Sequence, residues 1–289
     1  MGLAVLLAVV SAALPAQYTI PGDNVFPEGV SLRPGTDQFF VSSTGTGTIY
    51  RGTLGKPNLK VFLPGGEDGR NVANGLRAAR DKLVVAGGVT GYVFVYDYKG
   101  NLVRRFATGS GGLINDLAIA PNGDVYATDS MRGLLFRIAA KALSKGPAKR
   151  LNPFLRLTDT PVGQFGNGVV AAGDRYLLVV GTGSGVLGRV DLKTKRVKAV
   201  KGITLPAGDG LARTGSTLYA VNLATKVTQV KLSRDWLKAT FVRDITSPTF
   251  HFPTTVQIAG SRLLVVNSQF DNRTKTPVLP FTLSAVRRP

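Results

Sequence analysis

A short phrase that recurs six times is the feature that most constrains how this 289-residue chain can fold. In its clearest copy, Leu117–Ala120 is apolar, Pro121–Asp124 has strong turn chemistry, and Val125–Thr128 has the composition of a second strand. A polar residue, Asn115, stands just before the first strand. The remaining copies begin at Glu28, Asn74, Asn167, Asp209 and Thr254. This gives a repeat of roughly 40 to 50 residues, which is the spacing of propeller blades.

The repeat predicts an all-β protein, a six-bladed β-propeller formed as one domain by residues 17–289. Amphipathic helical stretches are scarce, and the best helix candidate is the short Ala139–Leu143. The last copy supplies only three strands and ends in Phe281–Val286. We therefore expect an N-terminal strand near Tyr18–Ile20 to join that blade and close the ring, because closure removes an unpaired edge. A two-sheet sandwich is the alternative, but it offers no reason for repeating one phrase six times.

The N-terminus predicts export. Leu3–Ala16 is an apolar run that ends in small residues, which is typical of the hydrophobic part of a secretory signal. It is too short to span a bilayer as a helix, so no transmembrane segment is expected. We predict that residues 1–16 are a signal peptide, that the mature chain begins near Gln17, and that the protein is secreted or lies in the periplasm or cell envelope. The alternative is a buried strand.

The formal net charge of +19 raises the question of a polyanionic partner. The basic residues are spread over the chain, and the densest cluster, Lys193–Lys198, falls where an outer hairpin turn is expected. Aromatic residues are not interleaved with basic ones as nucleic-acid stacking surfaces require. We therefore expect no specific nucleic-acid binding, a weak association with anionic envelope polymers, and a monomer. There is no cysteine, which excludes disulfides and thiolate chemistry.

The inner strands of a propeller all start at one mouth of the central channel, so the residues that open the six copies should converge there. They are Glu28, Asn74, Asn115, Asn167, Asp209 and Thr254. Five of the six carry a carboxylate or a carboxamide. A set of oxygen donors with low net charge predicts one divalent cation, Ca²⁺ before Mg²⁺, Mn²⁺ or Zn²⁺. The alternative is that each residue only bonds its own turn backbone.

The blade pattern resembles the SMP-30/gluconolactonase/LRE family, with the paraoxonases as more distant relatives. The resemblance lies in Phe26–Val30, Asn115–Leu117, Asn167–Val169 and Asp209–Leu211. It implies that Glu28, Asn167 and Asp209 bind one catalytic divalent ion, commonly calcium, and that Asn115 lies at the metal or substrate. It also implies hydrolysis of a lactone or ester. Asn74 is an additional amide, and Gly29 replaces the acidic residue of the second calcium site of paraoxonases, so one ion is expected.

The expected reaction is attack of water on the carbonyl carbon of a small-molecule lactone or ester that the ion polarises. Asp209 is the favoured general base and Glu28 the second choice, while Asn115 would orient substrate or ion. Substrate contacts are expected from Asn74, Arg132, His251 and Thr254, with Arg132 favouring an anionic substrate. The chain has no nucleophile elbow that would let its only histidine, His251, serve a catalytic triad.

Two other functions remain open at this point. One is a propeller without enzymatic activity that binds a small ligand, a peptide or an anionic envelope polymer through the same face. The other is a different reaction on the same ion.

Overall fold

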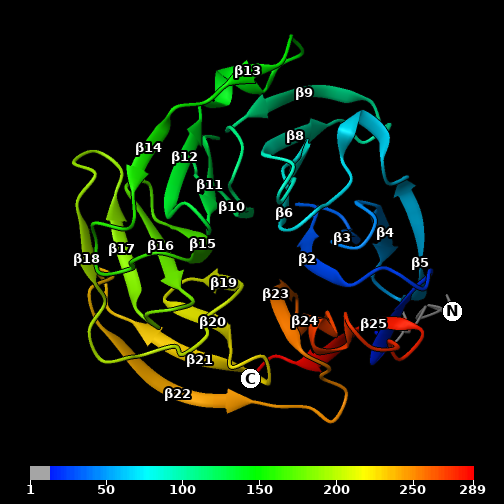
Figure 1. Ribbon diagram of the computed structural model, residues 1–289. Coiled ribbons are helices and arrows are strands. Elements are labelled where there is room, and N and C mark those ends of the chain that lie inside the picture. Colours follow the sequence, from blue (N-terminus) through cyan, green and yellow to red (C-terminus); the bar gives the residue numbers. More distant parts are fainter. Residues whose placement is uncertain (1–13) are drawn as a thin grey trace, which may run out of the picture.

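The computed structural model describes residues 14–289, and among these it contains strands and three short 3-10 helices but no α-helix. The sheets stand around a central opening, as Figure 1 shows. No helix in residues 14–289 has the length and apolar character needed to cross a bilayer. Most of the predicted signal peptide, residues 1–13, lies outside the described residues.

An eight-stranded sheet contains both ends of the described chain. One half is β2 (Pro27–Leu32), β3 (Gln38–Ser43), β4 (Ile49–Thr53) and β5 (Lys56–Leu63). The other half is β1 (Gln17–Ile20), β25 (Phe281–Arg287), β24 (Arg262–Asn267) and β23 (Pro253–Ala259). The expected N-terminal strand is present, because β1 pairs antiparallel with β25 and places Tyr18 opposite Leu283. Only one parallel bridge, Thr19 to Asn58, joins the two halves.

The other four sheets follow in chain order. The first contains β6 (Leu76–Ala78), β7 (Leu83–Ala86), β8 (Tyr92–Tyr96), β9 (Leu102–Ala107) and β13 (Lys149–Arg150), and the second β10 (Ile114–Ile119), β11 (Val125–Asp129), β12 (Leu134–Ile138) and β14 (Pro153–Arg156). The third contains β15 (Gly166–Ala172), β16 (Tyr176–Gly181), β17 (Leu187–Asp191) and β18 (Val197–Ala199), and the fourth β19 (Leu211–Thr214), β20 (Thr217–Asn222), β21 (Lys226–Leu232) and β22 (Ala239–Ile245). The 3-10 helices are η1 (Glu67–Gly69), η2 (Ala140–Leu143) and η3 (Phe270–Asn272).

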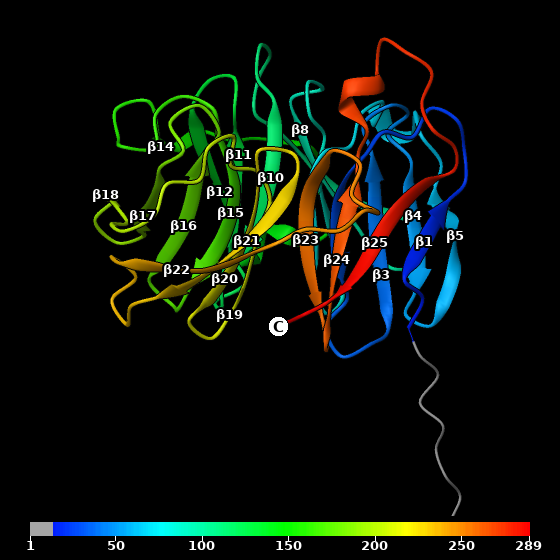
Figure 2. The ribbon, with the colours of Figure 1, turned by 90° about the horizontal axis from the view of Figure 1, so that it is seen from below.

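The innermost strands form a closed ring around the central opening. In order they are β2, β6, β10, β15, β19 and β23; each contacts the next, and β23 contacts β2. Seen from the side in Figure 2, the strands run between two ends of the molecule that carry the loops. We call the end where the inner strands begin, on the side of η3, the upper mouth, and the opposite end the lower mouth. Residues at equivalent places in the repeat therefore share a mouth.

Both faces of the second strand in each repeat are buried, which explains why these strands read as continuous apolar runs. Phe39 packs with Tyr18 and Phe281 on one side, while its neighbour Phe40 packs with Leu83 and Phe94 on the other. The same alternation separates six apolar clusters, one between each pair of adjacent inner-strand units. Each fully buried large apolar side chain contributes about 1.5–3 kcal/mol relative to an exposed one. The fold is therefore stabilised by packing between sheets placed face to face.

The segment 141–163, between the third and fourth copies of the repeat, contributes strands to two sheets. β14 is the outer strand of the sheet that contains β10–β12, and β13 pairs parallel with β9 of the neighbouring sheet. Phe154 of β14 packs edge-on against Tyr126, with ring centroids 5.5 Å apart. The segment that precedes β14 is long and irregular, so the sequence pattern does not predict this strand.

Candidate metal centre

The six residues that open the repeats lie at equivalent places at the upper mouth. Four of them are the second residue of an inner strand: Glu28, Asn115, Asn167 and Thr254. The other two, Asn74 and Asp209, lie two residues before β6 and β19. In those four strands the ladder register shifts across the polar residue and the residue after it. Such bulges re-aim side chains beside functional sites, and here they allow each polar residue to leave the regular pleat.

Glycines allow the neighbouring strand starts to approach one another closely. A Cβ atom on Gly168 would lie 2.1 Å from the backbone oxygen of Asp209, and one on Gly75 would lie 2.6 Å from that of Asn115. Backbone hydrogen bonds use this proximity, with Gly75 N donating to Asn115 O at 2.7 Å and Gly210 N donating to Thr254 O at 2.8 Å. The glycine after the polar residue therefore brings consecutive strand starts together.

Hydroxyl groups on the neighbouring second strands and loops fix the orientation of two amides. Asn115 Nδ2 donates to Ser130 Oγ at 3.0 Å, and Ser130 Oγ donates to the oxygen of Gly166 at 2.8 Å. Asn167 Nδ2 donates to Thr182 Oγ1 at 3.1 Å, and Thr182 Oγ1 donates to the oxygen of Gly208 at 2.7 Å. Because each NH₂ group is engaged in this way, the amide oxygen is the atom left to face another partner.

Buried oxygens without a hydrogen-bond donor are concentrated at this site. Glu28 Oε2, Asn74 Oδ1, Asn167 Oδ1 and Asp209 Oδ1 are all buried and unpartnered. Asn115 Oδ1 has only a long contact of 3.5 Å from Asn74 Nδ2. An unpartnered buried acceptor is costly, and a hard cation would satisfy several at once. The donor set therefore fits a calcium-type ion.

The ionisable groups at the site are strongly perturbed. Burial, followed by the nearby Asp116 carboxylate, raises the pKa of Asp209 to about 8, although the Asn167 amide and the Gly210 N–H act in the opposite direction. Burial and the carboxylates of Asp209 and Asp116 raise the pKa of Glu28 well above its ordinary value. Without a bound cation, the carboxyl group of Asp209 therefore retains its proton at neutral pH, and the raised pKa of Glu28 shifts that group in the same direction.

Among residues 14–289 no three His, Cys, Asp or Glu side chains come together as a metal-binding group. Any ion held at the upper mouth must therefore take part of its coordination from amide oxygens. The unpartnered oxygens of Asn74 and Asn167 are suited to this.

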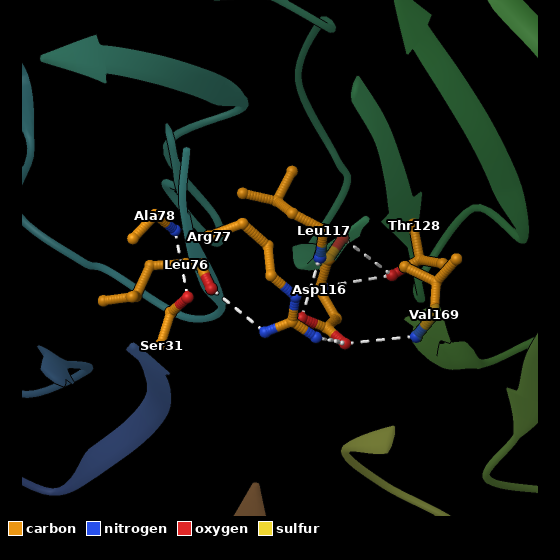
Figure 3. A network of polar contacts seen from close by, with 8 residues as sticks. All are labelled: Ser31, Leu76, Arg77, Ala78, Asp116, Leu117, Thr128 and Val169. Atoms are coloured by element: carbon orange, nitrogen blue, oxygen red, sulfur yellow. Dashed lines mark hydrogen bonds and ion pairs between the residues drawn. The ribbon is translucent and has the colours of Figure 1, made fainter. Parts of the chain in front are cut away.

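Sequence reasoning missed a buried ion pair just below the predicted ligands. Asp116 is 3% exposed, and its Oδ2 accepts from Arg77 Nη2 at 3.0 Å and from Val169 N at 3.1 Å. Its Oδ1 accepts from Leu117 N at 2.8 Å. Figure 3 shows Arg77 reaching from its own strand toward this carboxylate. The sequence does carry one signal: Asp116 occupies the position that is glycine in four of the other five repeats.

Arg273 is a second positive group that the sequence did not reveal. Its guanidinium lies over the rings of Phe270 and Phe26, with its central carbon 4.2 Å and 5.3 Å from their centroids, and it donates to Thr44 Oγ1. Arg77 and Arg273 both act to lower the pKa of Glu28. The site therefore has two cationic groups near its carboxylates.

The four residues predicted to contact substrate lie in different environments. Thr254 is fully buried and its hydroxyl donates to the backbone oxygen of Glu28 at 3.0 Å, which joins two strand starts. Arg132 is paired with Asp129 and donates to the oxygen of Thr108 at 3.0 Å, so its guanidinium is already engaged. His251 is exposed and lines a cavity of about 460 Å³ together with residues of η3. The fourth, Asn74, lies in the ring of unpartnered oxygens.

Comparison with known proteins identifies the fold. No protein-family model matches the sequence, and no curated protein matches it either. The chain is similar in structure to the major allergen Mala s 1 of Malassezia sympodialis, with a TM-score of 0.71, 14% identity, and 94% of this chain and 96% of that one covered. It is also similar to virginiamycin B lyase from Staphylococcus aureus, with a TM-score of 0.62, 9% identity, and 96% and 99% covered. Both are β-propellers, and at these identities the likeness shows that this chain has a β-propeller fold.

Proposed function

We propose that the protein is a six-bladed propeller that binds one Ca²⁺ ion at its upper mouth and hydrolyses lactones or esters. The observation that carries this proposal is the concentration of unpartnered buried oxygens on the residues that open the repeats: Glu28, Asn74, Asn167 and Asp209. The count of six blades is supported by the six inner strands in ring contact. In this count β1 is the outer strand of the blade formed by β23, β24 and β25, as its pairing with β25 suggests.

The proposed ligands are Glu28, Asn115, Asn167 and Asp209, as in the SMP-30/gluconolactonase-like proteins that the repeat resembles. Three of the four have an unpartnered buried oxygen, and the fourth, Asn115, turns its NH₂ group toward Ser130. Asn74 holds an unpartnered oxygen beside Asn115, which makes it the first candidate for a contact to substrate.

When bound, the ion would polarise the carbonyl oxygen of the substrate and stabilise the negative charge that forms on it. Asp209 accepts the proton of the attacking water, with Glu28 as the alternative base. A bound cation would lower their raised pKa values, which favours the ionised form that can accept a proton. Asn115 offers its oxygen, because its Nδ2 is held by Ser130.

Substrate contacts outside the ligand set come from the rim. His251 lines the cavity beside η3, which suits the part of the substrate remote from the carbonyl. Arg132 would have to share its guanidinium with Asp129, so its contribution to an anionic substrate is limited.

The test is hydrolysis of a panel of lactones and aryl esters, measured with calcium and with a chelator. We expect activity that is lost on chelation and reduced at least a hundredfold in Asp209→Asn. Asp235→Asn is the matched control, because Asp235 is an exposed carboxylate in the turn between β21 and β22. Activity that persists in the chelator, or in Asp209→Asn at the full rate, would reject the mechanism. Calcium binding with no hydrolysis anywhere in the panel would favour the non-enzymatic propeller, whose ligand would be a small molecule, a peptide or an anionic envelope polymer.

Export of the protein is part of the proposal. Cleavage after Ala16 would start the chain at Gln17, the first residue of β1; it would keep all four residues of β1 that pair with β25 and would remove only the hydrogen bond from Ala285 N to Ala16 O. The mature protein recovered from outside the cytoplasm should therefore begin near Gln17 when its N-terminus is sequenced. An intracellular protein that retains residues 1–16 would contradict this.

A further inference from the structure

The opposite end of the central channel contains a cavity that the proposed function does not use. It measures about 660 Å³ and is lined by the ends of the inner strands and the turns that follow them, among them Arg77, Arg80, Ala118, Ile119, Val170 and Arg213. This volume lies within the range of pockets that hold small organic molecules. The cavity is at the lower mouth, and Arg77, which lines it, is paired with Asp116, the buried residue that follows Asn115 of the upper mouth.

The charged groups that line this cavity are mainly positive. Three arginines and one carboxylate, Asp81, contribute to it, and Asp81 is already paired with Lys82. Within residues 14–289 the exposed guanidinium of Arg80 has no hydrogen-bond or carboxylate partner, although its backbone oxygen accepts from Arg33 at 3.3 Å. Arg213 is held in place because its Nε donates to the oxygen of Ala171 at 2.7 Å and its guanidinium stacks over Trp236.

The walls between these arginines are apolar. They consist of small aliphatic side chains from three consecutive inner strands and the turns after them: Ala78, Ala79, Ala118, Ile119, Ala120, Val170 and Ala171. Arginine matches the planar fork of a carboxylate, and aliphatic walls favour a hydrocarbon portion. We infer that the lower mouth is a second binding site, which takes a small organic carboxylate with a short aliphatic chain.

Arg77 connects this site to the upper mouth. Its Nη2 pairs with Asp116 Oδ2 at 3.0 Å, and Asp116 directly follows Asn115, one of the proposed ligands. A carboxylate that shares the Arg77 guanidinium leaves Asp116 less neutralised and makes the upper mouth more negative. Bound carboxylate should therefore strengthen cation binding, and by linkage the cation should strengthen carboxylate binding by the same factor. This coupling depends on the proposed cation site, whereas the lower site itself does not.

The test uses the full chain and hexanoate as the probe. Calorimetric titration in the presence of a chelator should show one saturable hexanoate site per chain, with inorganic phosphate as the comparison anion. The affinity should fall about tenfold for each arginine lost in Arg80→Gln and Arg213→Gln. Arg243→Gln, an exposed arginine on the outer strand β22, is the matched control and should bind as the unmodified protein does. Thermal unfolding of each variant establishes that it is folded.

Absence of saturable hexanoate binding, or binding that the Arg80 and Arg213 substitutions leave unchanged, would overturn the proposal. Phosphate binding more tightly than hexanoate would overturn the carboxylate specificity. The coupling is measured separately as the calcium affinity with and without saturating hexanoate, and an unchanged or weakened affinity would reject it. Because the binding arm is run in chelator without substrate, its outcome does not depend on whether the protein is a hydrolase.

Discussion

Replacing Asp209 with asparagine should make the metal-free protein more stable at neutral and mildly alkaline pH. The carboxyl group of Asp209 has a pKa of about 8 in the folded protein against an ordinary value of 3.8. Between these two values the unfolded chain has lost the proton and the folded chain still holds it, so the unfolded state binds fewer protons. Stability therefore falls as pH rises from about 4 to about 8, and then levels off.

The size of the effect follows from the same pKa values. One proton gives a slope of at most about 1.4 kcal/mol per pH unit, so the penalty accumulated by pH 8 is on the order of 3–6 kcal/mol. Asparagine does not ionise, and its introduction also removes a negative charge that raises the pKa of Glu28. Asp209→Asn should therefore have a much flatter profile, with its gain in stability largest at pH 8 and vanishing near pH 4.

The assay is urea unfolding in chelator from pH 4.5 to pH 8.5, with Asp235→Asn as the control for a carboxylate whose pKa is lowered. Saturating calcium should remove most of the penalty in the unmodified protein and little in Asp209→Asn. A flat profile for the chelated unmodified protein, or an equal slope in Asp209→Asn, would refute the argument that burial and Asp116 perturb this carboxyl group.

Three further substitutions test the construction of the site. Gly168→Ala should lower the free energy of unfolding by about 2–3 kcal/mol, because the added Cβ would lie 2.1 Å from Asp209 O. Gly183→Ala is the control: its Cβ would have its nearest atom at 3.5 Å, so the loss should be less than about 1 kcal/mol. Equal losses for the two variants in urea unfolding would contradict this. Thr182→Val should weaken calcium binding about tenfold in a calorimetric titration, with little change in Tm, because it removes the hydroxyl that accepts from the Asn167 amide. An unchanged affinity would show that this hydrogen bond is not needed to orient Asn167. Arg77→Met should destabilise the protein by about 3–5 kcal/mol at pH 7, because it leaves the buried Asp116 carboxylate unpaired. The loss should shrink in acid, where Asp116 is protonated. A loss that does not depend on pH would mean that packing rather than charge is responsible.

The repeat in the sequence was sufficient to predict the inner strands and the residues that open them. An apolar run such as Leu177–Val180 alternates its side chains between two neighbouring clusters, so its composition reports burial on both faces. Asn115 and Asn167 could be placed at one mouth because every repeat starts its inner strand there. These predictions rest on local periodicity, which the sequence carries directly.

The parts that could not be predicted depend on pairing across long separations. β13 joins β9 through a parallel pair more than forty residues apart, and no local pattern specifies this partner. The pair of Arg77 with Asp116 joins two inner strands. It can be recognised only when the fold places the starts of these strands side by side. Similarly, the glycine that follows four of the six polar residues could be read as turn chemistry, whereas the structure shows that it permits close approach of backbones.

Equilibrium dialysis with radioactive calcium, combined with substitutions at the upper mouth, tests the central claim most directly. The account predicts one calcium ion per chain in the unmodified protein, and at least a hundredfold weaker binding in Glu28→Gln, Asn167→Ala and Asp209→Asn while Asp235→Asn is unaffected. A folded protein that binds no calcium, or whose calcium binding survives all three substitutions, would contradict it.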